Sequence, residues 1–399
     1  MKPEQPSPAT PAKQLRTRLL LILGGLVAGL LVAEIALKIS GQPRFYEPHT
    51  SPPQFMFGEH IDFNTIGYLN KPSSSIRFQY DGDPRGYFGP QNEVSHLTNA
   101  IGFRGRPFPF DLDPQGNEIL SPKRDQAIRL AFLGDSFTFG EGVHDQDTFA
   151  QVTAANLQKR WPDRIVEAAN YGVGGYNTIQ SFHVLQRWAM KTDPDAVILG
   201  FVLNDAEPPI FTPDPVSGRP LRRQLAVEQG RFGTRPPGRL PGTGPPDRLW
   251  YRSNITQLFW KFRVQRQQTD GMVAHYRSLY TDTNPSWKTN RAALLAIVET
   301  CQQDQIPCYV VLFPELYELN ENYPFKDVHE HIKKTLAGTH ATFIDLFPLL
   351  AGKQAADLWV HPTDHHPNNE VHALVGKTLA ERLARDLPQN GAVKERGKK

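Results

Sequence analysis

Cysteine is scarce in this chain, which has two among its 399 residues, Cys301 and Cys308. Two cysteines cannot form a disulfide framework or a zinc site built from CxxC pairs, so the sequence does not point to metal chemistry. The two lie close together in the sequence, at the end of an expected helix and the start of an expected strand. A disulfide between them would close a short loop worth at most ~2–3 kcal/mol, and the sequence leaves open whether it forms.

The chain also lacks a large excess of charge of either sign. It has 44 Lys and Arg residues against 41 Asp and Glu residues, a net charge of +3, which is too small for a dedicated nucleic-acid-binding protein. Hydrophobic residues make up 39% of the chain and aromatic residues 10%, which excludes a disordered protein. The 35 prolines make up about 9% of the chain, above the usual ~5%, and predict long irregular connections around a folded core.

Polar side chains are missing from one continuous segment, residues 19–33, near the N-terminus. This apolar run resumes after Glu34, which gives roughly 15 to 19 residues, between the apolar region of a cleaved signal and a full membrane span. A small-x-small cleavage signature is missing around Val32-Ala33-Glu34, so an uncleaved anchor over residues 19–38 is favoured over a cleaved signal. Basic residues precede the run, namely Lys2, Lys13, Arg16 and Arg18.

The positive-inside rule then places residues 1–18 in the cytoplasm. We therefore expect a single-pass protein of the inner membrane, with Glu34 near the far interface and all that follows exported to the periplasm. The expected partners are this membrane and a small substrate, without nucleic acid.

Residues 42–125 and 126–388 differ in pattern. The first segment is rich in Pro, Gly and aromatics, with short candidate strands at 75–80 and 94–98, and predicts a small β-containing collar. In the second, strands alternate with helices, which predicts an α/β domain with a five-stranded parallel sheet covered by helices on both faces. The expected strands are 128–133, 164–169, 196–203, 308–313 and 341–346, and the expected helices are 148–160, 177–190, 291–302, 325–336 and 368–387. A basic tail, 389–399, follows.

An insertion at residues 206–286 interrupts this alternation. Its first half holds ten prolines between Pro208 and Pro246, from which we expect no regular structure. Its second half, residues 248–267, has apolar residues at helical spacing with basic residues between them. We predict a lid helix there, over the carboxyl edge of the sheet.

Chemistry-bearing residues follow successive sheet elements, at the edge where open parallel sheets bind ligands. Ser136 comes directly after the first strand in Gly134-Asp135-Ser136, where its hydroxyl can act as a nucleophile and its N–H can bind an oxyanion. A glycine-rich turn at 172–175 follows the second strand, and Asn204 follows the third. The block Asp364-His365-His366-Pro367-Asn368 precedes the last helix, which Asn368 is expected to cap.

Together these residues resemble the SGNH (GDSL-type) hydrolase family, in its exported, N-terminally anchored bacterial form, over residues 126–387. The resemblance implies Ser136 as nucleophile, His366 as base and Asp364 as its orienting carboxylate, with Ser136, Gly175 and Asn204 forming the oxyanion hole. It further implies a flavodoxin-like three-layer sandwich, hydrolysis or transfer of acyl groups, and no cofactor. The family commonly has two residues between the Asp and the His, whereas Asp364 and His366 have one between them.

Other residues compete for these roles. His361, His365 and His372 lie in the same region as His366, and Asp345 could orient the imidazole instead of capping the end of its strand. Asp135 is interpreted as a residue that organises the loop.

The expected function is hydrolysis of short acyl esters of carbohydrates through an acyl-enzyme. The alternatives are a lipid-directed esterase, lysophospholipase or thioesterase, an O-acyltransferase that uses the same Ser-His-Asp site, and a non-catalytic protein that binds acylated glycans.

Overall fold

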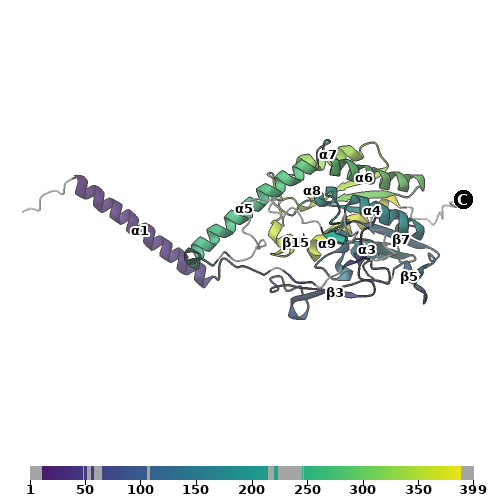
Figure 1. Cartoon of the computed structure of the whole chain (residues 1–399), viewed down its shortest axis with the longest axis horizontal. Helices are drawn as coiled ribbons and strands as arrows, with labels where there is room; N and C mark the ends of the chain where they lie inside the picture. Colours follow the sequence, from purple (N-terminus) through teal and green to yellow (C-terminus); the bar gives the residue numbers. More distant parts are fainter. Residues whose placement is uncertain are drawn as a thin grey trace, which may run out of the picture.

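We analysed a computed structural model of the chain (Figure 1). It describes residues 11–47, 49–51, 55–57, 65–105, 108–213, 220–222, 245 and 247–387. The expected basic tail and the first ten residues lie outside the described residues, as do five of the prolines of the insertion, Pro215, Pro236, Pro237, Pro241 and Pro246.

A five-stranded parallel sheet forms the centre of the larger domain, as predicted. Its strands are β7 (Ala127–Leu133), β8 (Ile165–Asn170), β9 (Ala196–Phe201), β12 (Cys308–Leu312) and β13 (Ala341–Asp345), in the order β13-β12-β9-β7-β8. All residues of β7, β9 and β12 are buried, because helices cover both faces. β8 lies on one side of β7, and the next strand, β9, lies on its other side. The carboxyl ends of the parallel strands β7 and β9 therefore lie side by side at one edge of the sheet.

The flanking helices pack in pairs, α3 (Phe149–Arg160) with α9 (Asn369–Asp386) and α4 (Thr178–Val184) with α6 (Pro285–Gln303). The remaining helices of the domain are α2 (Ser136–Phe139), α7 (Lys326–Leu336) and α8 (Phe347–Leu350). Asn368 caps α9 by accepting hydrogen bonds from the N–H groups of Glu370 and Val371, as expected. This confirms the predicted flavodoxin-like α/β architecture.

The collar is a set of antiparallel two-stranded ribbons that share the core of the larger domain. The ribbons pair β1 (Phe55–Met56) with β2 (Leu69–Asn70), β3 (Ser75–Gln79) with β4 (Glu93–Leu97), and β5 (Phe110–Leu112) with β6 (Glu118–Leu120). Tyr68 and Phe103 belong to the main hydrophobic core, and Phe78 and Tyr80 pack with Phe139 beside the end of α2. The collar is therefore a structural part of the larger domain.

The insertion differs from the prediction in two respects. Its proline-rich half contains a short hairpin, β10 (Phe211–Pro213) with β11 (Pro220–Arg222), so the expectation of no regular structure was wrong there. Prolines fit this hairpin because they stand at strand ends, Pro213 opposite Pro220.

The expected lid helix is instead a 26-residue helix, α5 (Asn254–Leu279), which connects the domain to the N-terminal helix α1 (Pro11–Ile39) (Figure 1). Its C-terminal end packs on the domain through Tyr276, Leu279 and Tyr280, and its N-terminal end contacts α1. Three of the four apolar residues that suggested a lid are exposed, Leu249 by 74%, Phe259 by 71% and Phe262 by 61%, whereas Trp260 is buried. The lid prediction was wrong because the spacing of apolar residues does not reveal what covers them.

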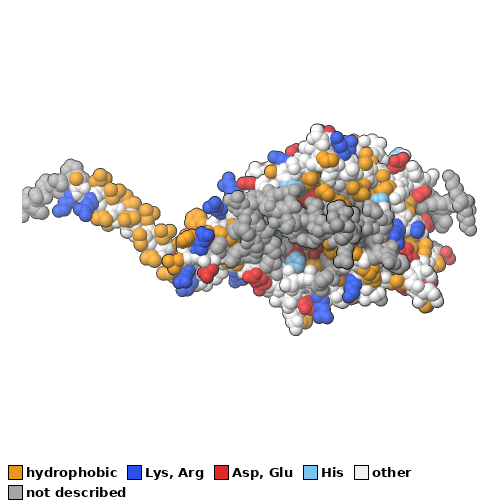
Figure 2. Space-filling view, in the orientation of Figure 1, with side chains coloured by type: hydrophobic (Ala, Val, Ile, Leu, Met, Phe, Trp, Pro, Cys, Tyr) orange, Lys and Arg blue, Asp and Glu red, His pale blue; other side chains and the backbone are white. Residues whose placement is uncertain are grey.

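Helix α1 extends away from the domain, and hydrophobic side chains are spread along it after the Lys and Arg side chains at its start (Figure 2). Residues Ala12–Ile39 are long and apolar enough to cross a membrane, a property that anchors share with signal sequences. The helix starts before the predicted span of 19–38 and includes three of the basic residues that precede it, Lys13, Arg16 and Arg18.

Cys301 on α6 and Cys308 on β12 are both buried free thiols, which answers the question that the sequence left open. A hydrogen bond with Cys301, in which the Cys308 thiol is the donor, together with burial, raises the pKa of the Cys308 thiol well above its ordinary value. Both cysteine side chains therefore contribute to the packing of the core.

Candidate active site

Ser136 stands at the first position of α2, directly after the buried strand β7. The preceding Gly134 has a φ of +143°, and a Cβ there would lie 2.6 Å from the carbonyl oxygen of Gly200, so the turn requires glycine. Asp135 caps the short helix by accepting a hydrogen bond from the Phe137 N–H at 2.9 Å. This confirms the interpretation of Asp135 as a loop-organising residue.

His366 and Asp364 reach Ser136 from a different part of the chain. They lie on β15 (Asp364–Pro367), which pairs antiparallel with β14 (Trp359–His361). The Nε2 atom of His366 is 2.8 Å from Ser136 Oγ, and its Nδ1 atom is 2.5 Å from Asp364 Oδ1. The three side chains thus form one hydrogen-bonded series, and the single residue between Asp364 and His366 does not prevent it.

The competing residues all have other partners. His361 Nδ1 lies 2.8 Å from Thr363 Oγ1, and the ring of His365 stacks on Trp359 with centroids 3.9 Å apart. The Nδ1 atom of His372 accepts a hydrogen bond from the Phe149 N–H. Asp345 is 3.0 Å from His329 and caps the N–H of Phe347, so it serves the end of its own strand.

The two further expected oxyanion donors lie at the same sheet edge. Asn204, in a turn after β9, donates from Nδ2 to Asp135 Oδ2 at 3.3 Å, which brings its amide next to the nucleophile. Gly175 lies in the turn after β8 with a φ of +77°, and a Cβ there would be 2.1 Å from Ile210 Cδ1. The Tyr68 hydroxyl donates to the carbonyl oxygen of the neighbouring Gly174 and fixes this turn.

Sequence reasoning missed several residues that contact the Ser-His-Asp series, among them Tyr80, Glu141 and His49, whose Nδ1 lies 3.9 Å from Asp364 Oδ2. The hydroxyl of Tyr80, from the collar, donates to Asp364 Oδ2 at 2.7 Å. Glu141, five residues after Ser136, places Oε2 3.7 Å from His366 Nε2, and its N–H donates to the carbonyl oxygen of Ser136. The contact of Glu141 could have been suspected because this residue is close to Ser136 in the sequence. No sequence feature indicates the contact of Tyr80.

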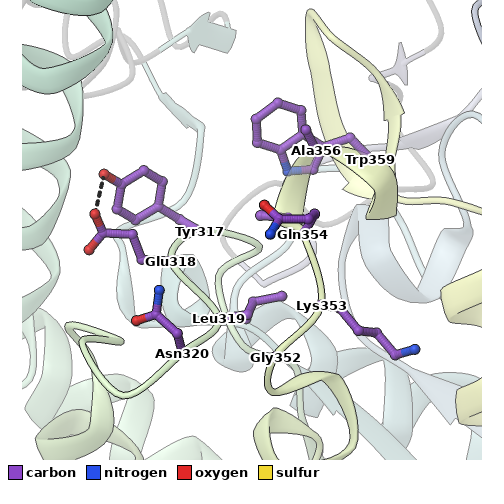
Figure 3. Close-up of a pocket in the computed structure, with 10 residues that line it drawn as sticks. Tyr317, Glu318, Leu319, Asn320, Gly352, Lys353, Gln354, Ala356 and Trp359 are labelled. Atoms are coloured by element: carbon purple, nitrogen blue, oxygen red, sulfur yellow. Dashed lines mark hydrogen bonds between the residues drawn. The ribbon is translucent and has the colours of Figure 1, made fainter.

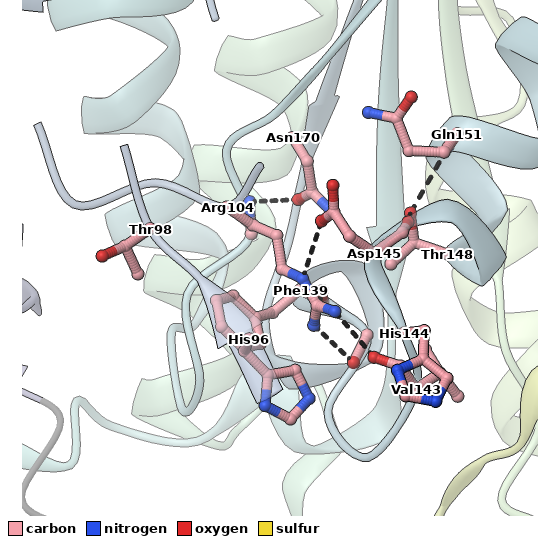
Figure 4. Close-up of polar contacts among 12 residues, drawn as sticks. His96, Thr98, Arg104, Phe139, Val143, His144, Asp145, Thr148, Gln151 and Asn170 are labelled. Carbon is pink, nitrogen blue, oxygen red and sulfur yellow. Dashed lines mark hydrogen bonds and ion pairs between the residues drawn. The ribbon is translucent and has the colours of Figure 1, made fainter. Parts of the chain in front are cut away.

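Another missed residue, Arg104 of the collar, is buried against the loop that follows α2 (Figure 4). Its guanidinium donates to the carbonyl oxygens of Phe139, Gly140 and Val143 and pairs with Asp145 at 3.1 Å. Cations stabilise the carbonyl ends of helices, so this side chain holds the C-terminal end of the helix that begins with Ser136.

The charges around the site are predominantly acidic. Burial alone would lower the pKa of His366, but the carboxylates of Asp364 and Glu141 raise it above its ordinary value. Burial opposes ionisation of Asp364, yet the adjacent His366 imidazolium and hydrogen bonds hold its pKa below its ordinary value. Burial and the charge of Asp135 raise the pKa of Glu315, which follows β12, to about 7.

A cavity of about 280 Å³ lies between the segments 317–320 and 352–359 (Figure 3). Its lining combines the aromatic side chains of Tyr317 and Trp359 with the polar side chains of Glu318, Asn320 and Gln354. Trp359 also stacks on His365 and lies on β14, the strand that pairs with β15.

Comparison with protein families matches residues 132–374 to the GDSL-like Lipase/Acylhydrolase family, a span that contains Ser136, Gly175, Asn204, Asp364 and His366. The chain belongs to this family. As a GDSL hydrolase it is an enzyme that acts on ester bonds, as the sequence predicted. A search of curated proteins found no match.

Solved structures similar to this GDSL hydrolase include several esterases. They include the psychrotrophic esterase EstA from Pseudoalteromonas sp., at 14% identity and a TM-score of 0.37, which covers 65% of this chain and 98% of its own. The acetyl xylan esterase AlAXEase is 13% identical with a TM-score of 0.37, covering 65% of this chain and all (100%) of its own. A two-domain esterase active on acetylated mannans is 15% identical with a TM-score of 0.34, covering 65% of this chain and 49% of its own.

Proposed function

We propose that this GDSL hydrolase is a serine esterase with Ser136 as nucleophile, His366 as general base and Asp364 as the carboxylate that orients His366. The observation that carries this proposal is the hydrogen-bonded series Ser136–His366–Asp364. His366 Nε2 accepts the proton of Ser136 Oγ as that oxygen attacks the ester carbonyl, and the resulting imidazolium is stabilised by Asp364. The same proton then goes to the leaving alcohol, and water resolves the acyl-enzyme.

The tetrahedral intermediate needs donors for its oxyanion, and we assign these to the N–H groups of Ser136 and Gly175 and the side-chain amide of Asn204. One N–H of the Asn204 amide is held by Asp135, which leaves the second for the substrate. Each such donor contributes ~10²–10³ to the rate.

The substrate that we favour is a short-chain O-acyl ester of a carbohydrate. The acidic groups of Asp364, Glu141 and Asp135 around His366 favour a neutral alcohol over an anionic phospholipid headgroup. The cavity that Trp359 lines, with two aromatic side chains and several polar ones, has the mixed lining that orients small polar ligands. The same site could use a sugar hydroxyl as acceptor and act as an O-acyltransferase, and long-chain lipid esters or thioesters are the other alternative.

Hydrolysis of aryl esters of increasing acyl length tests these assignments on the full chain. We expect turnover of short esters that collapses beyond about four carbons, and a loss of several orders of magnitude in Ser136→Ala. Ser95→Ala, at an exposed position of β4, is the matched control and retains full activity. Undiminished turnover in Ser136→Ala contradicts the assigned nucleophile, and a preference for long chains favours the lipid-directed alternative. Repeating the series with an acceptor sugar separates transfer from hydrolysis.

We further propose that α1 is an uncleaved anchor and that the domain faces the periplasm, which the basic residues before the apolar run support. A reporter fused after Lys399 should be active only in the exported compartment, and the protein should stay with membranes in high salt. Replacement of Lys13, Arg16 and Arg18 by Glu should reduce or invert insertion. A soluble protein with a mature N-terminus near Gln42 would contradict the anchor, and unchanged orientation in the charge-reversed variant would contradict the role of the basic residues.

A further inference from the structure

The segment that joins α1 to the hydrolase domain, which we call the neck and define as residues 248–266, is held to α1 by Glu34. The carboxylate of Glu34 accepts hydrogen bonds from the N–H groups of Asn254 and Ile255 at 2.7 and 3.0 Å and from the Ser253 hydroxyl at 2.8 Å. Glu34 thus supplies a negative charge to the N-terminus of α5, where the helix dipole favours an anion. The start of α5 is thereby fixed at the end of α1.

A second contact determines which side of the neck faces the rest of the chain. The ring of Trp260 packs edge-on against Phe45 with centroids 6.0 Å apart, and Lys261 Nζ donates to the carbonyl oxygen of Arg44. Both partners lie in the segment that follows α1. One face of the neck is therefore occupied by protein.

The other face combines exposed apolar side chains with basic ones. Phe259, Phe262, Arg263 and Arg266 are spaced by three or four residues and share one face of α5, and all four are exposed. Just before the helix, Leu249 is 74% exposed and Trp250 58% exposed. Large exposed apolar side chains that cluster in this way indicate an interaction surface.

The charge of the neck has a single sign. It contains five basic residues, Arg248, Arg252, Lys261, Arg263 and Arg266, and no acidic residue, although the whole chain is nearly balanced. In Figure 2, Lys and Arg side chains gather along the side of α5 that faces α1. A surface that is both apolar and cationic is complementary to anionic lipid headgroups above an apolar layer.

The position of the neck relative to a bilayer follows from α1. The uninterrupted apolar run of α1 ends at Ala33, and Glu34 is the first charged residue after Arg18. A run of this length occupies most of the ~30 Å hydrocarbon layer, so Glu34 and the start of α5 reach the level of the headgroups. Aromatic residues such as Trp250 and Tyr251 are typical of this depth.

We propose that the neck lies in the headgroup layer of the membrane that α1 spans and binds anionic lipids, with Phe259, Phe262 and Trp250 inserted and Arg263 and Arg266 on the headgroups. This surface is separate from the hydrolase site and goes beyond the proposed function. It requires α1 to be retained in the mature protein. The binding fixes the distance and orientation of the catalytic domain relative to the bilayer.

The test uses the full chain in vesicles of phosphatidylcholine with or without phosphatidylglycerol. An environment-sensitive fluorophore is attached at Phe262→Cys and, as the control, at Lys333→Cys on α7, which is exposed on the domain. Cys301 and Cys308 are buried, so the introduced thiol is the reactive one. We expect a blue-shifted emission at position 262, quenched by lipids brominated near the headgroup and protected from aqueous iodide, and the opposite at position 333.

The charge-reversed variant Arg263→Glu/Arg266→Glu should lose the blue shift and the bromine quenching in phosphatidylglycerol vesicles, while it hydrolyses a soluble aryl ester at the unchanged rate. This hydrolysis measurement is independent of lipid contact, so failure of the esterase proposal and failure of the lipid proposal are distinguished. Equal iodide quenching at positions 262 and 333 overturns the inference. A blue shift without bromine quenching also overturns it, because the neck is then covered by protein, such as a second copy of the chain.

Discussion

Glu141 is the residue whose position near His366 has the clearest chemical consequence. Its carboxylate lies 3.7 Å from His366 Nε2, the nitrogen that accepts the proton of Ser136 in the proposed mechanism. A negative charge at this distance favours the protonated imidazolium, which is the form that develops after the attack by serine. The same charge raises the pKa of His366 in the enzyme without substrate. Glu141 therefore stabilises the imidazolium, and it also narrows the pH range of activity because the neutral base exists only at higher pH.

Glu141→Gln should therefore shift the acidic limb of kcat/KM to lower pH. The amide removes a charge that favours imidazolium, so the pKa of His366 falls and the neutral base persists at lower pH. The measurement is the pH profile of kcat/KM on a neutral aryl ester. Glu330→Gln on α7, where the carboxylate pairs with Lys333, should leave the profile unchanged. A limb that stays in place or moves to higher pH contradicts the role given to Glu141.

The Tyr80 hydroxyl donates a hydrogen bond to Asp364, the carboxylate at the end of the Ser136–His366–Asp364 series. Tyr80→Phe removes the donor to the buried Asp364, and we expect kcat to fall about tenfold, which is ~1.4 kcal/mol and near the lower end for a hydrogen bond to a charged group. Tyr87→Phe is the matched control, because the Tyr87 hydroxyl donates at the same 2.7 Å distance to Asp147, outside the series. Equal losses of kcat in both variants would show that Tyr80 acts only through stability.

At the scale of elements, the short helix α2 depends on the collar for its position. Arg104→Lys removes the planar donor group that reaches three carbonyl oxygens and a carboxylate at once, and lysine cannot reproduce that geometry. We expect a loss of about 3 kcal/mol in the free energy of unfolding, together with a lower kcat. Denaturant unfolding monitored beside activity measures both. Arg77→Lys, at an exposed position of β3, should change neither, and an unaffected Arg104→Lys protein would contradict the account.

The junction of α1 and α5 gives a second prediction at this scale. Glu34→Ala leaves the N–H groups of Asn254 and Ile255 without their acceptor, so their hydrogen exchange in the full chain should accelerate. Ile39→Ala, at the exposed end of α1, is the control. Unchanged exchange at the start of α5 would mean that Glu34 does not hold the junction.

The elements themselves were largely predictable from the sequence. Largely apolar runs such as 128–133, interrupted by Arg129, and 308–313 identified the buried parallel strands, and the end of each strand located Ser136, Asn204 and the turn that contains Gly175. Local patterns could not predict contacts between distant segments. The collar residues Tyr80 and Arg104 contact groups that lie far from them along the chain, and nothing in the spacing around them indicates a buried donor. The lid prediction for 248–267 was wrong for the same reason, since that segment contacts Glu34 and the residues just after α1, which lie far from it along the chain.

At the scale of the whole molecule, the protein is an α/β hydrolase domain with a collar built into its core and a long apolar helix attached through α5 (Figure 1). Helix α5 is bound to α1 at its start and packed on the domain at its end, so it transmits the orientation of α1 to the domain. If α1 spans a membrane, the catalytic domain is held at a fixed distance from the bilayer surface. The substrate must then reach the enzyme at that distance.

The central claim is that Ser136 is the nucleophile and His366 is its base. Labelling of the full chain with a serine-reactive phosphonate, followed by mapping of the modified peptide by mass spectrometry, tests it most directly. We predict one adduct, on Ser136, formed far more slowly in His366→Ala and at the normal rate in His361→Ala. An adduct on any other residue, or a larger loss of labelling in His361→Ala than in His366→Ala, would contradict the account.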